Sequence, residues 1–341
     1  MITDSPTAAP LSRVPHFPTV YDDELLYSIV ARYGVMTGYI ESSSANLDLF
    51  GTPFGHGSAR APSALDAMAS RLPLGLNLDA RELVTRHTLL PYYYAFFPDD
   101  RQEKAIGEAL ARHGRADKAA GMEAKPLSPP RRLKFCPECL DVMELRKQEL
   151  HWKRVHQLAI VMLCPDHGSD LRFSSITPHP ADRLMAPATR ANCAPDAPIG
   201  TASNMQIDRE ALLGLACGAR TLLNGGYPAN ATREKASGLA QLFRDLGYKR
   251  SSRINWEMLQ PEVQKVVSGV TAVIPGIERA GARDDGWFDH AMDPRRIGRS
   301  DRVLIAAMLI DRIEAVEPRF WAAIDKMTGK PFMDLPATAR A

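Results

Sequence analysis

Residues 134–171 contain the feature that most restricts how this chain can fold. The stretch begins with Cys136-Pro-Glu-Cys139 and ends with Cys164-Pro-Asp-His167, two knuckles of the form C-P-x-C and C-P-x-H. Structural Zn²⁺ sites take four ligands at tetrahedral corners, mostly thiolates with some imidazole. Two residues between paired ligands allow a tight turn to aim both side chains at one point, and proline stiffens that turn. The spacing predicts one Zn²⁺ per chain, bound by these four side chains.

The interval between the knuckles supports a structural role for this site. Its 24 residues leave room for a helix or hairpin that returns the second pair to the first. A single cysteine is equally well explained as a small buried hydrophobe, but four ligands in matched knuckles are not. No ligand position is left open for water, which indicates a structural metal rather than a catalytic one. We expect His151 and His156 to lie outside the ligand set, and Trp152 and Leu158 to pack around it.

The overall composition is that of an ordinary globular protein whose functional surfaces must be local. The 341 residues are enough for two or three domains, and 45% of them are hydrophobic and 24% charged. A formal net charge of +2 gives no global nucleic-acid signature, so any basic surface has to be a local one. Five cysteines, three of them in the knuckles, indicate thiolates used for metal in a reducing compartment rather than disulfides.

The sequence shows no segment for export or membrane insertion. Residues 1–18 lack an apolar core with a charged preface, and the longest apolar run, residues 158–163, is too short to span a bilayer. We therefore expect a soluble, cytoplasmic protein that has no contact with a membrane.

Helical periodicity outside the knuckles predicts a mainly α fold. Apolar residues follow helical spacing in the N-terminal and C-terminal parts, whereas strand-like alternation is scarce outside the metal-binding stretch. Stretches rich in proline, glycine, alanine or serine separate these parts. We expect a disordered tail (1–14), an N-terminal helical domain (15–115), a linker (116–130), a zinc-binding module (131–173), a second linker (174–204) and a C-terminal helical domain (205–341).

The N-terminal region offers two features that suit either a helical core or an interface. The acids of residues 22–24 precede apolar residues at helical spacing, where the dipole of a first helical turn favours negative charge. We expect this helix to end at Gly34 or Gly38. The aromatic run PYYYAFFP, residues 91–98, has two interpretations: rings that pack a small helical core, and rings that contact a partner or stack on bases.

A basic connector in the C-terminal part is the first choice for contacts with nucleic-acid phosphates. Lys249, Arg250 and Arg253 lie in the connector and Arg244 lies on the preceding helix, and the only acid among them is Asp245. A helix, a glycine turn, this connector and a second helix resemble a helix-turn-helix reader with a longer connector than usual. A solvated corner of a helical bundle explains the pattern equally well. The second choice for phosphate contacts is Arg295, Arg296 and Arg299.

No catalytic signature is present in the sequence. It has no GxxxxGK[ST] nucleotide loop, GxGxxG turn, GxSxG elbow or HExxH zinc motif. We therefore expect a protein without enzymatic activity. A nuclease triad assembled from distant acidic residues leaves no such spacing, so a nuclease stands as a third hypothesis.

Three stretches resemble the TniQ/TnsD family of transposon target-selection proteins. They are PHFPTVYDDELLYSIVARYG (15–34), HTLLPYY (87–93), and FCPECL, HWKRVHQL and LCPDHGSDL within 135–171. Residues 205–325 resemble the part that follows in TnsD-like members, more weakly. The resemblance implies a helix-turn-helix-type N-terminal region, a zinc-ribbon-like module, and DNA targeting in the bacterial nucleoid with recruitment of a TnsC-like AAA+ ATPase.

The sequence departs from the family in two ways. Many relatives carry a second set of knuckles, whereas the corresponding stretch here holds only Cys193, which again predicts one zinc. The longer TnsD members extend well past 341 residues with an arm that reads a chromosomal site. We therefore expect this chain to read a shorter site, or to be delivered by a CRISPR guide-RNA complex or another DNA-bound partner.

We expect the ATPase to bind the N-terminal helical domain. Aromatic side chains gathered near a surface loop make good interface anchors, and this region has such a group. The residues assigned to this contact are Glu24, Arg32, Tyr33, Tyr92, Tyr93, Tyr94 and Phe97.

Together these features predict a non-catalytic adaptor for DNA transposition. One surface would bind target DNA or its reader, and another would recruit the ATPase. The main rival hypothesis is a zinc-stabilised transcriptional regulator that binds DNA as its sole function. Genes for an AAA+ ATPase and a transposase beside this one would separate the two.

Overall fold

The structure is a computed structural model of the 341-residue chain. It describes residues 14–53, 59, 62–73, 75–76, 78–122, 127, 130–178, 185–194, 207–225, 241, 243–251, 253–271, 273–282, 286–292, 301–302 and 305. Of the expected tail, only Val14 is among them, and it is buried. The second group of expected phosphate contacts, Arg295, Arg296 and Arg299, lies outside the described residues.

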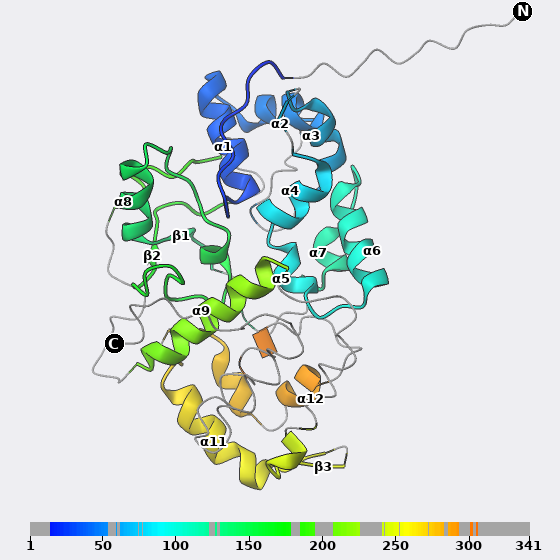
Figure 1. Ribbon diagram of the computed structural model, residues 1–341, viewed down its shortest axis with the longest axis vertical. Helices are drawn as coiled ribbons and strands as arrows, with labels where there is room; N and C mark the ends of the chain where they lie inside the picture. The colour runs from blue at the N-terminus through cyan, green and yellow to red at the C-terminus, as the bar shows by residue number, and fades with distance from the viewer. Residues whose placement is uncertain are drawn as a thin grey trace, which may run out of the picture.

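Helices form most of the secondary structure in the described residues, which confirms the expected mainly α fold. The N-terminal region consists of α1 (Leu26–Thr37), α2 (Ser42–Phe50), α3 (Leu65–Arg71), α4 (Ala80–His87), α5 (Leu90–Tyr94), α6 (Asp99–Leu110) and α7 (Ala116–Ala119), at the top and right of Figure 1. Their apolar faces meet in a core of aliphatic and aromatic side chains. Among the described helices, none combines the length and apolar character that a membrane crossing requires.

Helix α1 begins later than the sequence suggests. Its N-cap is Leu25, and its first turn holds no acidic residue. Asp23 and Glu24 precede the helix, and the Asp23 carbonyl accepts the backbone N–H of Arg154 at 2.8 Å. These acids therefore join the start of the chain to the middle module instead of complementing the helix dipole. The helix ends at Gly38, whose φ of 71° is left-handed, as one of the two expected stops.

The expected zinc-binding module is the part of the fold in which the chain turns back on itself. It contains β1 (Lys134–Phe135), α8 (Pro137–Leu145), the 3₁₀ helix η2 (Val155–Gln157) and β2 (Arg172–Phe173). Strands β1 and β2 pair antiparallel, with Lys134 opposite Phe173 and Phe135 opposite Arg172. This pairing brings the beginning and the end of the module side by side, beside α1 in Figure 1.

Both intervals expected as linkers pack onto the body of the protein where the structure describes them. The first begins with α7 and buries Met122 and Leu127. In the second, the Ala186 carbonyl accepts the indole N–H of Trp152 at 2.9 Å, and the Ala186 N–H donates to the Tyr27 hydroxyl at 3.0 Å. The alanine and proline content of these intervals therefore does not predict whether they pack against the rest of the protein.

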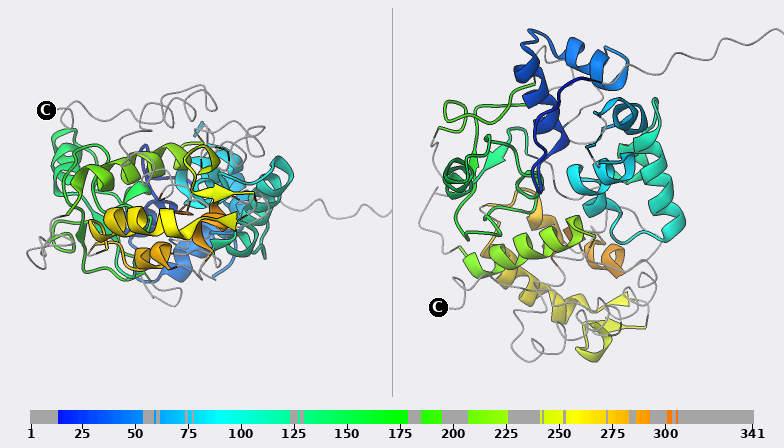
Figure 2. Two further views of the ribbon diagram at one scale, coloured as in Figure 1. Left: turned by 90° about the horizontal axis from the view of Figure 1, so that it is seen from below. Right: turned by 45° about the horizontal axis from the view of Figure 1, so that its top comes forward.

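The C-terminal region combines helices with one short hairpin. Its described elements are α9 (Arg209–Leu223), β3 (Lys249–Arg250), β4 (Arg253–Ile254), α11 (Trp256–Ser268), the 3₁₀ helix η4 (Ile277–Gly281) and α12 (Trp287–Met292). Helix α9 runs diagonally beneath the N-terminal helices and the middle module, and α11 lies below it (Figure 1, Figure 2). The basic connector forms the β3–β4 hairpin, so the expected helix-turn-helix is corrected to an arrangement of helix, hairpin and helix.

One buried guanidinium joins all three regions. Arg154, just before η2, donates to the Asp23 carboxylate at 3.2 Å and to the Asn224 side-chain oxygen at 3.1 Å. It also donates to the carbonyls of Thr85 and Thr88, at 2.7 and 3.2 Å. These partners precede α1, end α4 and cap α9. A planar guanidinium suits this junction because its five N–H groups can serve several acceptors at once.

A second long-range contact holds the C-terminal region against α5. The Tyr92 hydroxyl donates to the Asp301 carboxylate at 2.6 Å, and both side chains are buried. Burial raises the pKa of Tyr92 well above its usual value, so the phenol is the proton donor. Next to Asp301, the Arg302 guanidinium lies 5.5 Å from the centre of the Trp287 ring. Helix α5 also contacts α9, so it is covered from two directions.

We predict that Arg154→Met lowers the free energy of unfolding by about 3 kcal/mol, because it leaves the half-buried Asp23 carboxylate without the guanidinium that pairs with it. Urea unfolding followed by tryptophan fluorescence measures this. Arg86→Met is the matched control: its side chain is 53% exposed, and its nearest carboxylate oxygens are 3.8 and 3.9 Å away. We expect the control to change stability by no more than about 0.5 kcal/mol. Equal losses in both variants would contradict the assigned role of Arg154.

Candidate metal centre

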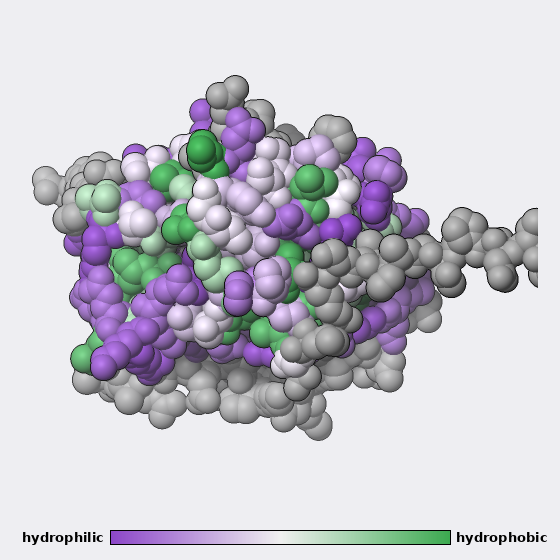
Figure 3. Space-filling model, turned by 90° about the horizontal axis from the view of Figure 1, so that it is seen from above, coloured by the Kyte–Doolittle hydropathy of each residue, from purple (hydrophilic) through white to green (hydrophobic). Residues whose placement is uncertain are grey.

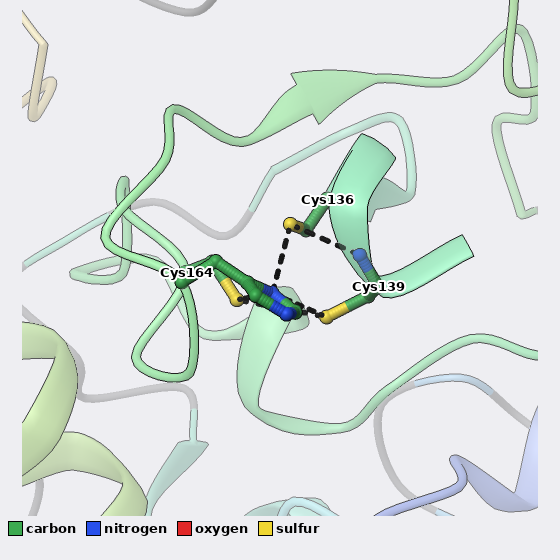
Figure 4. Close-up of side chains that lie close together, drawn as sticks. Cys136, Cys139 and Cys164 are labelled. Atoms are coloured by element: carbon green, nitrogen blue, oxygen red, sulfur yellow. Dashed lines mark hydrogen bonds between the residues drawn. The ribbon is translucent and has the colours of Figure 1, made fainter. Parts of the chain in front are cut away.

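The first knuckle is the beginning of a helix. Pro137 is the first residue of α8, and the Cys136 sulfur accepts the backbone N–H of Cys139 at 3.4 Å as the N-cap. Proline suits this position because an N–H there would have no partner within the helix. The first helical turn then places both sulfurs on the side that faces the second knuckle (Figure 4).

The second knuckle is a tight turn closed by backbone hydrogen bonds. The Cys164 N–H donates to the Ser169 carbonyl at 2.8 Å, and the Gly168 N–H donates to the Cys164 carbonyl, also at 2.8 Å. Gly168 has a φ of 69°, a left-handed conformation that residues with a side chain rarely adopt. The turn holds the His167 Nδ1 3.6 Å from the Cys164 sulfur.

The three cysteine side chains point toward one another (Figure 4), and His167 completes the group. Their ligand atoms all lie within 4.8 Å of one another. The His167 Nδ1 is 3.4–3.6 Å from each of the three sulfurs, and the sulfurs of Cys139 and Cys164 are 3.6 Å apart. Usual zinc bond lengths in a tetrahedron separate sulfur from nitrogen by about 3.6 Å and two sulfurs by about 3.8 Å. The observed separations are therefore those of a four-ligand metal site.

The same crowding explains why the cluster favours a cation. Hydrogen bonds from the thiols of Cys139 and Cys164 lower the pKa of Cys136, so one thiolate forms easily. The hydrogen bond to Cys136 raises the pKa of Cys139, and it raises the pKa of Cys164 to about 12. A divalent cation offsets this penalty and permits three thiolates, and Zn²⁺ is well suited to three sulfurs and one imidazole. The residues therefore fit a Zn²⁺ ion.

The two other histidines of the module have different surroundings. Among the described residues, the group that can hold a metal consists of the four knuckle side chains and excludes His151 and His156. The His151 Nδ1 lies 3.0 Å from the Glu149 carbonyl, and its ring stacks on Tyr21. Burial lowers the pKa of His151 to about 4 and that of His156 to about 3, so both rings are neutral. The Ser169 hydroxyl, 3.2 Å from the Cys136 sulfur, is the polar neighbour that sequence reasoning missed.

A buried lysine in β1, two residues before the first knuckle, stabilises the module through hydrogen bonds. The Lys134 ammonium donates to the Leu158 carbonyl at 2.8 Å and to the Val161 carbonyl. Burial lowers the pKa of Lys134 to about 7. The Gln157 side chain adds hydrogen bonds to the N–H and the carbonyl of Lys134, both at 2.9 Å. These polar contacts fix the path of the interval that returns the second knuckle to the first.

Helix α9 holds the second knuckle with two arginines on one of its faces. Arg209 donates to the Asp170 carboxylate at 2.9 Å and to the Gly168 carbonyl at 3.0 Å. Arg220 donates to the Asp166 carboxylate at 2.9 Å. The two arginines are about three helical turns apart, so they share a face and reach both sides of the turn. The sequence carried the signal, an arginine pair at helical spacing and aspartates within and just after the knuckle, but sequence reasoning missed the contact.

The residues expected to bind a partner form part of the interior instead. All seven are buried: Glu24, Arg32, Tyr33, Tyr92, Tyr93, Tyr94 and Phe97. The Arg32 guanidinium donates to both carboxylate oxygens of Glu24 at 2.9 Å and also reaches Glu149 of the middle module. The aromatic run is therefore core, and in this conformation none of its rings in the expected set presents a surface to a partner.

The surface of the N-terminal region carries other apolar side chains. Its exposed large hydrophobic residues are Val35, Met36, Ile40 and Leu47, at the end of α1, in the following turn and in α2. Seen from above, this end of the molecule is mostly polar or neutral, with separate apolar spots (Figure 3). Any protein partner of this surface would meet small apolar areas bordered by polar groups.

The basic connector divides into exposed and engaged side chains. Arg244, Arg250 and Arg253 are exposed. The Lys249 side chain is only 11% exposed, and its ammonium lies 3.7 Å from the Asp289 carboxylate in α12. The structure thus separates Lys249 from the three arginines with which the sequence grouped it.

Comparison with known proteins identifies the N-terminal half of the chain. Residues 15–171 match the family model of TniQ, a stretch that includes all four candidate metal ligands. Over 159 residues the chain is 28% identical to the transposon Tn7 transposition protein TnsD of Escherichia coli. The aligned stretch covers 46% of this chain and 31% of that protein. The aligned part therefore spans about a third of the relative's length. The chain carries a TniQ domain, which confirms the resemblance inferred from its sequence.

We predict that the purified protein contains one zinc per chain by mass spectrometry, and that Cys139→Ser or Cys164→Ser brings the content close to zero. A site with three ligands left loses the tetrahedral shell on which its affinity depends. The double variant His151→Ala, His156→Ala is the matched control and should keep full zinc content. A stoichiometry near two, or loss of zinc in the histidine variant, would show that the ligands are wrongly assigned.

A second prediction concerns the docking of α9. In the double variant Arg209→Gln, Arg220→Gln, we expect hydrogen exchange of the α9 amides to become about fivefold faster, because two partly exposed ion pairs contribute about 1 kcal/mol together. Arg190→Gln is the control, since Arg190 pairs with Asp141 and Glu144 of α8 and not with α9. Unchanged exchange in the double variant would mean that apolar packing alone holds α9.

Proposed function

Because residues 15–171 form a TniQ domain, we propose that this chain is a non-catalytic target-site selector for DNA transposition. One surface binds target DNA, or a guide-RNA complex bound to that DNA, and another recruits a TnsC-like AAA+ ATPase. The observation that carries this proposal is the similarity of the same stretch to TnsD, which is itself a transposition protein. We place this activity in the cytoplasm, at the bacterial nucleoid.

In this proposal the metal centre has a structural role. Cys136, Cys139, Cys164 and His167 would hold one Zn²⁺, and the four ligands leave no position for a substrate or water. The ion would cross-link the start of α8 to the turn of the second knuckle, which the arginines of α9 contact. The module would then fix the two helical regions relative to each other and would have no catalytic role.

The C-terminal region is the proposed site of DNA contact. The exposed arginines Arg250 and Arg253 of the basic connector, with Arg244 on the preceding helix, provide local positive charge on a chain whose net charge is only +2. A sequence-independent contact of this kind suits a protein that is directed to its site by another factor as well as one that reads a short site itself.

We propose that the N-terminal surface around Val35, Met36 and Ile40 contacts the ATPase. These side chains are exposed, whereas the aromatic residues first assigned to this contact are buried. Small apolar areas bordered by polar groups are typical of surfaces that bind and release a partner. The transcriptional-regulator hypothesis shares the basic connector with this proposal, but it gives no reason for the TniQ match.

We predict that the purified protein captures the AAA+ ATPase encoded beside its gene, in the presence of DNA, and that Ile40→Asp lowers the captured amount at least about tenfold. Leu145→Asp, on α8, is the matched control, because Ile40 and Leu145 are both 84% exposed. Both positions are exposed, so we expect both variants to fold. A lower amount of captured ATPase for Ile40→Asp alone would then indicate a contact at the N-terminal surface.

The cellular test is a transposition assay with and without this gene. We expect insertions at a defined site when the protein is present and loss of that site preference when it is absent. Directed insertion that continues without the protein, together with no capture of the ATPase, would favour the transcriptional regulator instead.

A further inference from the structure

The β3–β4 hairpin has two chemically different faces. Lys249 lies opposite Ile254, and Arg250 lies opposite Arg253. Neighbouring residues of a strand point to opposite faces, so each opposed pair shares one face of the hairpin. The first pair faces the protein, since Ile254 packs against the core and Lys249 is largely buried beside Asp289. The face of Arg250 and Arg253 is therefore directed to solvent, and both residues are exposed.

The two outward arginines lie directly opposite each other, and no acidic residue that the structure describes forms an ion pair with them. In an antiparallel pair, directly opposed side chains have Cβ atoms about 4.5–5.5 Å apart, and like charges at this distance destabilise the pair. Within the part of the chain that the structure describes, no acidic side chain forms an ion pair with Arg250 or Arg253. The nearby Arg244 guanidinium donates to the Gln241 side chain at 2.7 and 3.0 Å, so it too has no acidic partner there.

The hairpin is held firmly enough to keep this pair in place. At its base, the Asn255 N–H donates to the Tyr248 carbonyl at 2.8 Å. Beneath it, the rings of Phe243, Phe288 and Trp256 pack against one another, with centres 5.7 and 6.2 Å apart. Strand β4 also contacts α12. A charged pair on a supported element loses little conformational freedom when it binds a ligand.

The turn of the hairpin adds local backbone strain. Only two residues separate the strands, and Ser251 has a φ of 52°. Two-residue hairpin turns favour asparagine or glycine at positions with positive φ, so serine is a strained choice here. Such strain persists where the surrounding structure fixes the backbone, and it is concentrated at functional sites.

We propose that Arg250 and Arg253 form a phosphate-binding pair that neutralises two adjacent phosphates of a DNA strand. Phosphate oxygens would relieve the repulsion between the two guanidinium groups and match their forked N–H donors. Lys249 has no part in this contact, because Asp289 already engages its ammonium. This inference rests on the proposed function, and it names the element that contacts DNA in that role.

The test measures the affinity of the full-length protein for a mixed-sequence DNA duplex by fluorescence anisotropy, at several salt concentrations between about 50 and 200 mM. For Arg250→Gln, Arg253→Gln we expect the slope of log affinity against log salt to become shallower by about 1.8, or 0.9 for each lost phosphate contact. At about 0.1 M salt this corresponds to an affinity loss on the order of 50-fold. Arg250→Lys, Arg253→Lys keeps both charges and should keep the slope, although loss of the forked donors can lower the affinity itself.

The matched control is Arg101→Gln, Arg112→Gln, which removes the same charge from two exposed arginines in and just after α6. It should leave both affinity and slope unchanged, and circular dichroism should show that every variant is folded. If the wild-type protein binds DNA and the hairpin variant binds equally well, the inference fails while the proposed function stands. If the wild-type protein shows no salt-dependent binding, the proposed DNA contact fails as well. A lysine variant whose slope is as shallow as that of the glutamine variant would show that the charges of the hairpin do not contact phosphates, and it would overturn the inference.

Discussion

A buried positive charge must be surrounded by acceptors, and Arg154, which lies in the middle module, has its acceptors in the N-terminal and C-terminal regions. The guanidinium therefore fixes the start of α1, the end of α4 and the cap of α9 relative to the module from which it extends. Glu24 and Arg32 form a second buried pair beside it, and Arg32 also reaches Glu149. Regions that look separable by composition are thus a single body wherever the structure describes them.

The contacts that hold this body together differ widely in strength. A structural zinc in a small module is associated with about 10 kcal/mol or more of folding free energy. Breaking a buried charge junction such as that of Arg154 costs about 3 kcal/mol, and an exposed ion pair such as those of α9 contributes about 1 kcal/mol or less. With Zn²⁺ bound as proposed, the module and the Arg154 junction would form the most stable part of the protein, whereas the polar contacts of α9 are weaker.

The features that could be predicted from the sequence are those set by neighbouring residues. The knuckles fold as their spacing indicates because a proline at the start of a helix and a tight turn are local events. The basic residues could be located by charge, but the engagement of Lys249 depends on Asp289 in α12, 40 residues further along the chain. By sequence alone the aromatic run suits a helical core and an interface equally well, and its burial depends on partners as distant as Asp301. Local patterns carry no information about such partners.

The hydrogen bond between Tyr92 and Asp301 joins residues 209 positions apart, which has a consequence for how the protein is made. At about 5–20 residues per second, the ribosome completes α5 on the order of ten to forty seconds before it reaches Asp301. During that interval the face of α5 that will receive the C-terminal region is open on the nascent chain. Chaperones, or a second nascent chain on the same messenger RNA, can occupy that face first. A truncated product that ends before residue 301 would keep it open permanently, which makes such products candidates for aggregation and proteolysis.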